Sequence, residues 1–181
     1  MTKDLPPPEL LRKLLRYEPE TGKLFWRERT PDMFTSEGSF KAWNSRWAGK
    51  EAFTAALKSG YLHGCVFGKF YRAHRVIWAM QTGACPVHHI DHVDGNPSNN
   101  RMENLREATH GENSYNRGRQ NNNTSGYKGV SWSATNKKWR AQIVKNGKRR
   151  HLGYFLCQEK AHQAYCVASK ELHGVYSNTG A

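Results

Sequence analysis

Four side chains between residues 91 and 113 have the types and spacing that metal-assisted hydrolysis requires. Asp91 and His92 are adjacent, Asn104 follows 12 positions after His92, and Asn113 follows nine positions later. A neutral imidazole with a pKa near 6.5 can take a proton from water, and a carboxylate with an amide oxygen can hold a hard divalent cation. Asp91, His92 and Asn113 supply these groups, and Asn104 is placed to hold the imidazole and tie the adjoining loop to the strand.

The sequence around these residues predicts a strand, a loop, a second short strand and a helix. The tetrapeptide Asp94-Gly-Asn-Pro97 is a strong turn signal. Thr109 with Glu112 three residues later fits a capping box that opens a helix. We therefore expect Asp91 and His92 at the end of a strand and Asn113 in the first helical turn, close enough to share one ion.

This segment resembles the HNH, or His-Me finger, homing endonucleases of phages. The pattern is Asp-His-x-x-Gly-Asn, then Asn-Asn, then Asn-Leu, then a final Asn in place of the last His, and it is met by Asp91, His92, Gly95, Asn96, Asn99, Asn100, Asn104, Leu105 and Asn113. The resemblance implies a ββα-metal centre in which His92 is the general base, Asp91 and Asn113 bind Mg²⁺ or Mn²⁺, and Asn104 orients His92. It also implies products with a 5′-phosphate and a 3′-hydroxyl. His88, His89 and His110 leave a rival register open, with His89 as the base or His110 as the final His.

Charge is distributed unevenly along the 181 residues. Residues 1–85 hold 14 lysines and arginines against 8 acidic residues, residues 86–118 hold 3 against 5, and residues 119–181 hold 11 against 2. The formal net charge of +13 argues for a polyanionic partner. An acidic centre between basic flanks is expected if the flanks contact phosphates and the centre binds a cation.

The basic region 1–85 precedes the motif and is predicted to supply a small scaffold. Leucines at helical spacing predict a helix near residues 10–15, residues 24–26 a strand, residues 61–73 a hairpin, and residues 74–83 a helix ended by glycine. Residues 30–60 show no clean period and are predicted to be irregular. Arg72 and Arg75 are candidate phosphate contacts in this region.

Composition excludes several classes of protein. A mean hydropathy of −0.85 allows only modest cores and argues against a single large α/β enzyme. The longest uncharged run, residues 76–90, is too short to span a bilayer, and the N-terminus lacks a secretory signal. Four cysteines without a Cys-x-x-Cys pair are predicted to be buried rather than to bind zinc. We expect a cytoplasmic protein of a bacterial or phage-infected host cell, without membrane association or a small-molecule cofactor.

The C-terminal segment predicts a meander of three strands followed by a helix. Apolar and polar residues alternate on both sides of Asn146-Gly147, and alanines follow helical spacing after residue 160. The segment resembles the plant ethylene-responsive-factor DNA-binding domain through Tyr127-Lys-Gly-Val130, Lys138-Trp-Arg-Ala-Gln-Ile143, Leu152-Gly-Tyr-Phe155 and a helix ending His173-Gly174. The resemblance implies a sheet face that reads duplex DNA through Lys128, Arg140, Gln142, Arg149 and His151. Ser131 and Val144 stand where the plant pattern commonly has arginine, so base specificity is not carried over.

Together these features predict an α+β protein of small modules. The predicted modules are a basic N-terminal region at 1–85, an HNH nuclease motif at 86–118, a linker at 119–125, and a DNA-binding domain at 126–181. We expect a metal-dependent endonuclease that acts on double-stranded DNA and, as a monomer, nicks one strand. The alternative is a sequence-specific DNA-binding regulator with an inactive nuclease centre, and RNA binding is a weaker third hypothesis.

Overall fold

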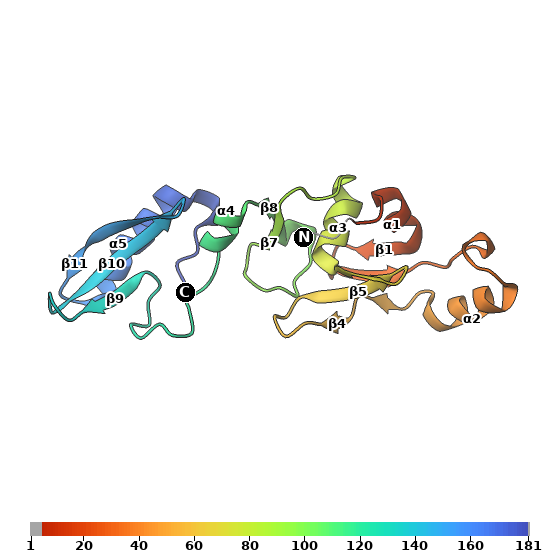
Figure 1. Cartoon of the computed structure of the whole chain (residues 1–181), viewed down its shortest axis with the longest axis horizontal. Helices are drawn as coiled ribbons and strands as arrows, with labels where there is room; N and C mark the ends of the chain where they lie inside the picture. The colour runs from red at the N-terminus through yellow and green to blue at the C-terminus, as the bar shows by residue number, and fades with distance from the viewer. Residues whose placement is uncertain (1–4, 181) are drawn as a thin grey trace. The chain divides into compact units, whose positions relative to one another are not determined.

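The computed structural model describes residues 5–180, which form two compact units. The N-terminal unit extends to Glu107 and the C-terminal unit begins at Ala108. Each is a mixed α+β unit built on small antiparallel sheets (Figure 1). The division at Glu107 lies inside the segment 86–118, because Ile90 and Leu105 pack into the same core as the residues before them.

Two short helices form the centre of the N-terminal unit. Leu11 and Leu14 of α1 and Val76 and Ile77 of α3 are completely buried, which accounts for the apolar spacing of both segments. Gly83, with φ 76°, ends α3 in the left-handed conformation expected of a C-terminal glycine. The elements of this core are α1 (Pro8–Leu14), β1 (Leu15–Glu18), β2 (Lys23–Trp26), β3 (Glu51–Ala52) and α3 (Ala73–Thr82).

A hairpin and a two-stranded sheet complete the N-terminal unit. The hairpin predicted at 61–73 is confirmed, with a tight turn at Phe67-Gly68 between its strands. β7 and β8 flank the candidate loop and pair with each other, as the sequence predicted for the first part of the motif. The elements are β4 (Ala55–Ala56), β5 (Leu62–Val66), β6 (Lys69–Arg72), β7 (His89–His92), η2 (Met102–Asn104) and β8 (Leu105–Ala108).

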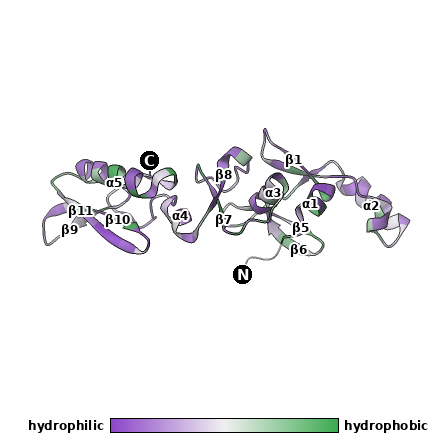
Figure 2. Ribbon diagram, turned by 90° about the horizontal axis from the view of Figure 1, so that it is seen from above, coloured by the Kyte–Doolittle hydropathy of each residue, from purple (hydrophilic) through white to green (hydrophobic). Residues whose placement is uncertain are grey.

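The prediction that residues 30–60 are irregular was wrong, because this stretch contains the helix α2 (Glu37–Trp47) after a short turn η1 (Pro31–Met33). Ser36 caps α2 by accepting a hydrogen bond from the Ser39 amide. No residue of α2 is buried, and most of its residues are hydrophilic (Figure 2). Phe40, Trp43 and Trp47 follow helical spacing on α2, but none of them is fully buried, and the polar residues and glycine around them weaken the apolar pattern.

The C-terminal unit begins with α4 and continues into a sheet covered by one helix. The predicted hairpin around Asn146-Gly147, the third strand and the long helix are all present. Ala141, Ala161 and Tyr165 lie in the small cores between the sheet and α5 (Figure 1). The elements are α4 (His110–Tyr115), β9 (Val130–Ser133), β10 (Lys138–Lys145), β11 (Lys148–Phe155), α5 (Gln158–His173) and η3 (Gly174–Tyr176).

The cysteine prediction was wrong in part. Cys65 and Cys85 are exposed, and Cys157 and Cys166 are half-buried, since all four lie near element ends or on helix flanks rather than in the core. Among residues 5–180, no helix combines the length and the apolar character needed to cross a membrane.

Candidate functional site

His92 lies at the end of β7 with its side chain almost completely buried, 3% exposed. The Oδ1 atom of Asn100 is 3.1 Å from His92 Nε2. Since an amide oxygen accepts, the neutral ring carries its proton on Nε2 and its lone pair on Nδ1. Burial lowers the pKa of His92, although Asn100, Asp94 and Asp91 oppose the shift, so the imidazole is neutral near pH 7. This is the protonation state that a general base needs.

Two aromatic rings hold the imidazole of His92 in place. The ring centroids of Tyr61 and His74 lie 5.7 Å and 5.1 Å from that of His92. Burial lowers the pKa of His74 to about 3, and His92, Arg72 and Arg75 add to the effect. His74 therefore stays neutral and provides packing rather than a competing proton carrier.

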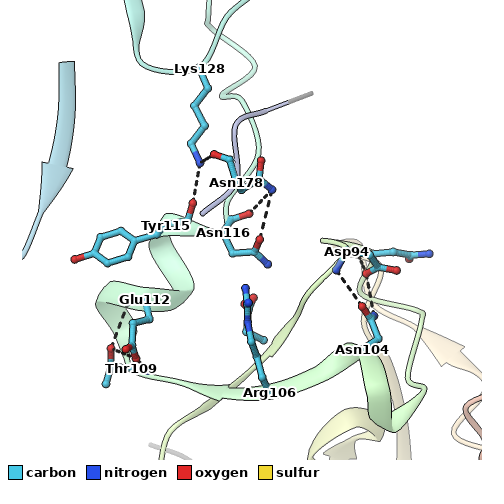
Figure 3. A network of polar contacts seen from close by, with 11 residues as sticks. Asp94, Asn104, Arg106, Thr109, Glu112, Tyr115, Asn116, Lys128 and Asn178 are labelled. Atoms are coloured by element: carbon cyan, nitrogen blue, oxygen red, sulfur yellow. Dashed lines mark hydrogen bonds and ion pairs between the residues drawn. The ribbon is translucent and has the colours of Figure 1, made fainter. Parts of the chain in front are cut away.

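Asn104 organises the loop after β7. Its Oδ1 accepts from the Asp94 amide at 3.0 Å, while its Nδ2 donates to Asp94 Oδ1 at 2.9 Å and to the Asn99 carbonyl at 2.8 Å (Figure 3). The tie between loop and strand that the sequence suggested is therefore present. The predicted contact between Asn104 and the His92 imidazole is not made, because Asn104 in η2 turns its side chain toward Asp94. Asn100 contacts the imidazole instead.

The carboxylate of Asp94 is the hub of this loop. Desolvation alone would raise the pKa of Asp94, but hydrogen bonds from Asn99, the Asn96 amide and Asn104 lower it below its ordinary value. A charged, fully bonded Asp94 keeps the Asp-Gly-Asn-Pro turn rigid, and this turn carries the chain from His92 to Asn100.

Residues near the N-terminus support the same loop. The Tyr17 hydroxyl accepts from the Met102 amide at 2.8 Å and donates to the Asn100 carbonyl at 3.2 Å, and Arg101 Nε donates to the Glu20 carbonyl at 2.7 Å. Gly22, with φ +72°, packs so closely that an added Cβ would lie 2.6 Å from the Arg101 nitrogen. The basic N-terminal region thus positions Asn100 and, through it, His92.

Asp91 precedes His92 and is 6% exposed. Arg106 on β8 donates to Asp91 Oδ2 from Nε at 2.9 Å and from Nη2 at 2.8 Å. Such a charge-assisted pair offsets the cost of burying the Asp91 carboxylate. Sequence reasoning missed Arg106, although its position directly after Asn104-Leu105 placed it on the strand that pairs with β7.

Asn113 lies in the first turns of α4, which belongs to the C-terminal unit, whereas Asp91, His92, Asn100 and Asn104 come together in the N-terminal unit. The predicted capping box is confirmed: Thr109 accepts from the Glu112 amide and Glu112 accepts from the Thr109 amide. Asn113 is half-buried, and the three alternative histidines, His88, His89 and His110, are exposed.

The donor types fit a hydrated hard cation. A carboxylate oxygen of Asp91 and an amide oxygen of Asn113 are ligands that Mg²⁺ or Mn²⁺ accepts while it keeps several waters. Across the described part of the chain, no three His, Cys, Asp or Glu side chains gather into a site that could hold a metal by themselves.

Lys128 makes its hydrogen bonds within the C-terminal unit, whereas the sequence resemblance implied a contact with DNA. Its Nζ donates to the carbonyl oxygens of Tyr115 at 2.8 Å, Arg117 at 2.6 Å and Asn178 at 2.8 Å (Figure 3). Burial lowers the pKa of Lys128 to about 8. The half-buried ammonium thus caps the carbonyl end of α4 and joins it to the C-terminal tail.

Further contacts fasten α4 to the same unit. The ring of Tyr115 stacks on His173 with centroids 3.9 Å apart, and the Asn146 amide donates to the Tyr115 hydroxyl at 2.9 Å. Asn178 donates to the Asn116 carbonyl at 2.8 Å (Figure 3). The helix that carries Asn113 is therefore held by the sheet, by α5 and by the tail.

The predicted reading face lies on the side of the sheet opposite α5. Gln142 pairs with His151 and Val144 with Arg149 across β10 and β11, while Ala141 and Ile143 between them point into the core. Arg149 and His151 are exposed, and Gln142 is half-buried. Arg140 is also half-buried and donates to Ser131 Oγ at 3.2 Å. A two-stranded ribbon with such side chains has the width of a DNA major groove.

The two arginines proposed as phosphate contacts differ. Arg75 donates to the carbonyls of His88 at 3.0 Å and Pro86 at 3.1 Å, so its guanidinium braces the chain before β7. Arg72 is exposed and lies over the Tyr61 ring, 4.7 Å from its centroid. Of the two, Arg72 remains accessible to a phosphate.

Comparison with known proteins gives the chain its class. Residues 71–115 match the HNH endonuclease family and residues 125–174 match the AP2 domain. The chain therefore belongs to the HNH endonuclease family and carries an AP2 domain, as both resemblances predicted.

Two relatives are similar to this chain in sequence. Protein 3.8 of Escherichia phage T7 is 36% identical over 115 residues, which cover 61% of this chain and 94% of that protein. An uncharacterized HNH endonuclease of Acanthamoeba polyphaga mimivirus is 34% identical over 122 residues, 66% of this chain and 62% of that protein. No solved structure matches the chain.

Proposed function

We propose that this protein is a metal-dependent DNA endonuclease of the homing type, with a ββα-metal centre that hydrolyses phosphodiester bonds. The observation that carries the proposal is the neutral His92, held through Nε2 by Asn100 next to Asp91. His92 Nδ1 takes the proton of the attacking water. Asp91 and Asn113 would hold Mg²⁺ or Mn²⁺, which would neutralise charge on the leaving oxygen.

The protein's own residues divide the remaining work. Asn100 holds the imidazole through Nε2, Asn104 holds the loop through Asp94, and Arg106 pairs with the Asp91 carboxylate. In the C-terminal unit, the sheet face with Arg140, Gln142, Arg149 and His151 binds double-stranded DNA. A monomer carries one such centre and hydrolyses one bond at a time, so its product is a nick.

The test is cleavage of supercoiled plasmid with Mg²⁺. We expect nicked circles from the natural protein, no cleavage with chelator, and a loss of about 10²–10⁴-fold in rate for His92→Ala, because that is the usual contribution of a general base. His88→Ala, in an exposed histidine of the same segment, serves as the matched control and should cut normally. Equal rates for the natural protein and His92→Ala would refute the assignment.

A second candidate is a DNA-binding regulator with an inactive nuclease centre. The ion pair between Arg106 and Asp91 favours it, because both bonds occupy an oxygen of the proposed metal ligand. The same plasmid assay separates the two: duplex binding without any metal-dependent cleavage would identify a regulator.

A further inference from the structure

A pocket of about 480 Å³ in the N-terminal unit has six Trp and Phe rings in its lining. Its walls come from the end of β2, from α2 and from the β5–β6 hairpin. We refer to it as the aromatic pocket; its rings are Trp26, Trp43, Trp47, Phe53, Phe67 and Phe70. Its volume lies in the range of small-ligand sites. Trp47, Phe67 and Phe70 are 38%, 58% and 58% exposed, so these apolar rings are accessible to a ligand.

Arg29 lines the aromatic pocket with its guanidinium over a ring. The guanidinium carbon is 3.8 Å from the Trp43 centroid, and the Arg29 backbone is fixed by Asn44 at 3.0 Å and 2.9 Å. Within residues 5–180, Arg29 Nε is buried without a hydrogen-bond partner, and no carboxylate pairs with the guanidinium. A positioned cation without a counterion favours an anionic ligand.

The other charges around the aromatic pocket point the same way. Glu51 also lines it, but Lys23 neutralises this carboxylate at 2.8 Å. Arg46 adds a second guanidinium 5.0 Å from the Trp47 centroid. The pocket therefore combines flat apolar walls with net positive charge, which suits a ligand that has both an aromatic ring and an anionic group.

The hairpin turn beside the aromatic pocket is strained in a way that burial does not explain. Phe67-Gly68 has φ values of 49° and 75°, nearly the same as Asn146-Gly147 with 51° and 75° in the other unit. Asn-Gly is the preferred sequence for such a turn, whereas a bulky residue at positive φ is a conformational outlier. Phe67 is also largely exposed. Strain that presents an exposed ring at a pocket is typical of a functional position.

We propose that the aromatic pocket binds one unpaired nucleotide of the DNA strand, with the base stacked among the rings and the phosphate on Arg29. The proposal rests on DNA as the substrate in the proposed function. Bases stack on aromatic side chains whatever their sequence, and a basic region of 14 lysines and arginines against 8 acidic residues attracts the backbone. The pocket would hold the strand without reading its sequence.

The test compares binding to a duplex that contains one bulged 2-aminopurine nucleotide with binding to the same duplex without the bulge. The full chain carries His92→Ala and is kept in chelator, so no cleavage step enters the measurement. We expect the natural pocket to favour the bulged duplex about tenfold and to change the 2-aminopurine fluorescence. Phe67→Asn should remove this preference, leave binding to the perfect duplex unchanged, and raise the melting temperature because the turn strain is relieved.

Arg29→Gln is the second variant and should also lose the preference, while Val87→Asn, at an 82% exposed position away from the pocket, should keep it. An undiminished preference in both Phe67→Asn and Arg29→Gln would overturn the proposal. Full displacement of the bulged duplex by equimolar free thymidine monophosphate would also overturn it, because the pocket would then serve mononucleotides. A failure of plasmid cleavage would count only against the nuclease assignment.

Discussion

Lowering the pH from 7 to 5 should destabilise the N-terminal unit through His74. This imidazole is 4% exposed, packs against Tyr61 and His92, and has no hydrogen-bond partner for its buried Nδ1 within the described residues. The unfolded chain binds a proton at this residue near pH 6.5, whereas burial lowers the pKa in the folded protein to about 3. Acid therefore favours the unfolded chain, and the loss of stability accumulates as the pH falls from 6.5 to 3.

The size of the effect follows from these two pKa values. At pH 5 the His74 side chain is almost fully protonated in the unfolded chain and neutral in the folded protein. This difference lowers the free energy of unfolding by about 2 kcal/mol at pH 5, whereas its effect at pH 7 is nearly zero. His92 contributes in the same direction because burial also lowers its pKa. A variant that removes only His74 isolates its share.

The assay is urea unfolding at pH 7 and pH 5, followed by tryptophan fluorescence. His74→Phe keeps a ring between Tyr61 and His92 but cannot bind a proton, so its stability should fall by about 2 kcal/mol less than that of the natural protein over this range. His88→Phe, at an exposed position, should follow the natural protein. The same pH dependence in His74→Phe and the natural protein would refute the reasoning.

Three further changes test other contacts. Arg106→Met leaves Asp91 buried without its cation and should cost about 3 kcal/mol in urea unfolding; a cost below about 1 kcal/mol would mean that the ion pair is unimportant for stability. Lys128→Met removes three hydrogen bonds from the end of α4, so hydrogen exchange of the α4 amides should accelerate about tenfold or more while duplex affinity changes little. Unchanged exchange would contradict that role. Gly129→Ala would place a Cβ 2.1 Å from the Tyr165 ring at φ +75°, whereas Gly147→Ala has the same φ but open space around the new Cβ. In urea unfolding, Gly129→Ala should therefore lower the free energy of unfolding by about 3 kcal/mol and Gly147→Ala by about 1 kcal/mol. Equal costs would show that the close packing is irrelevant.

The local signals in the chain were reliable where an element has one buried face or a specific cap. The Thr109–Glu112 box, the glycine that ends α3 and the turn at Asn146-Gly147 each depend on neighbouring residues only, and all three are present. α2 escaped prediction because its aromatic residues Phe40, Trp43 and Trp47 stand among polar residues and none is fully buried, so the apolar period is weak.

The position of the two adjacent candidate residues was likewise predictable from the local sequence. Asp91 and His92 were placed at a strand end, where they lie. Their roles in catalysis, and that of Asn113 as a ligand, stay predictions. Sequence spacing could not predict which neighbouring residue holds each of these side chains by hydrogen bonds.

Amino-acid order alone was sufficient for the HNH motif, the AP2 resemblance and the basic character of the flanks, because each is a property of residues close together in the chain. Tertiary packing decided which groups are available. Asn100 rather than Asn104 meets the imidazole, Tyr17 reaches Met102 across 85 positions, and Lys128 is consumed by backbone carbonyls. Whether a polar side chain faces solvent or a buried partner depends on segments distant in the chain, and only the folded core brings those segments into contact.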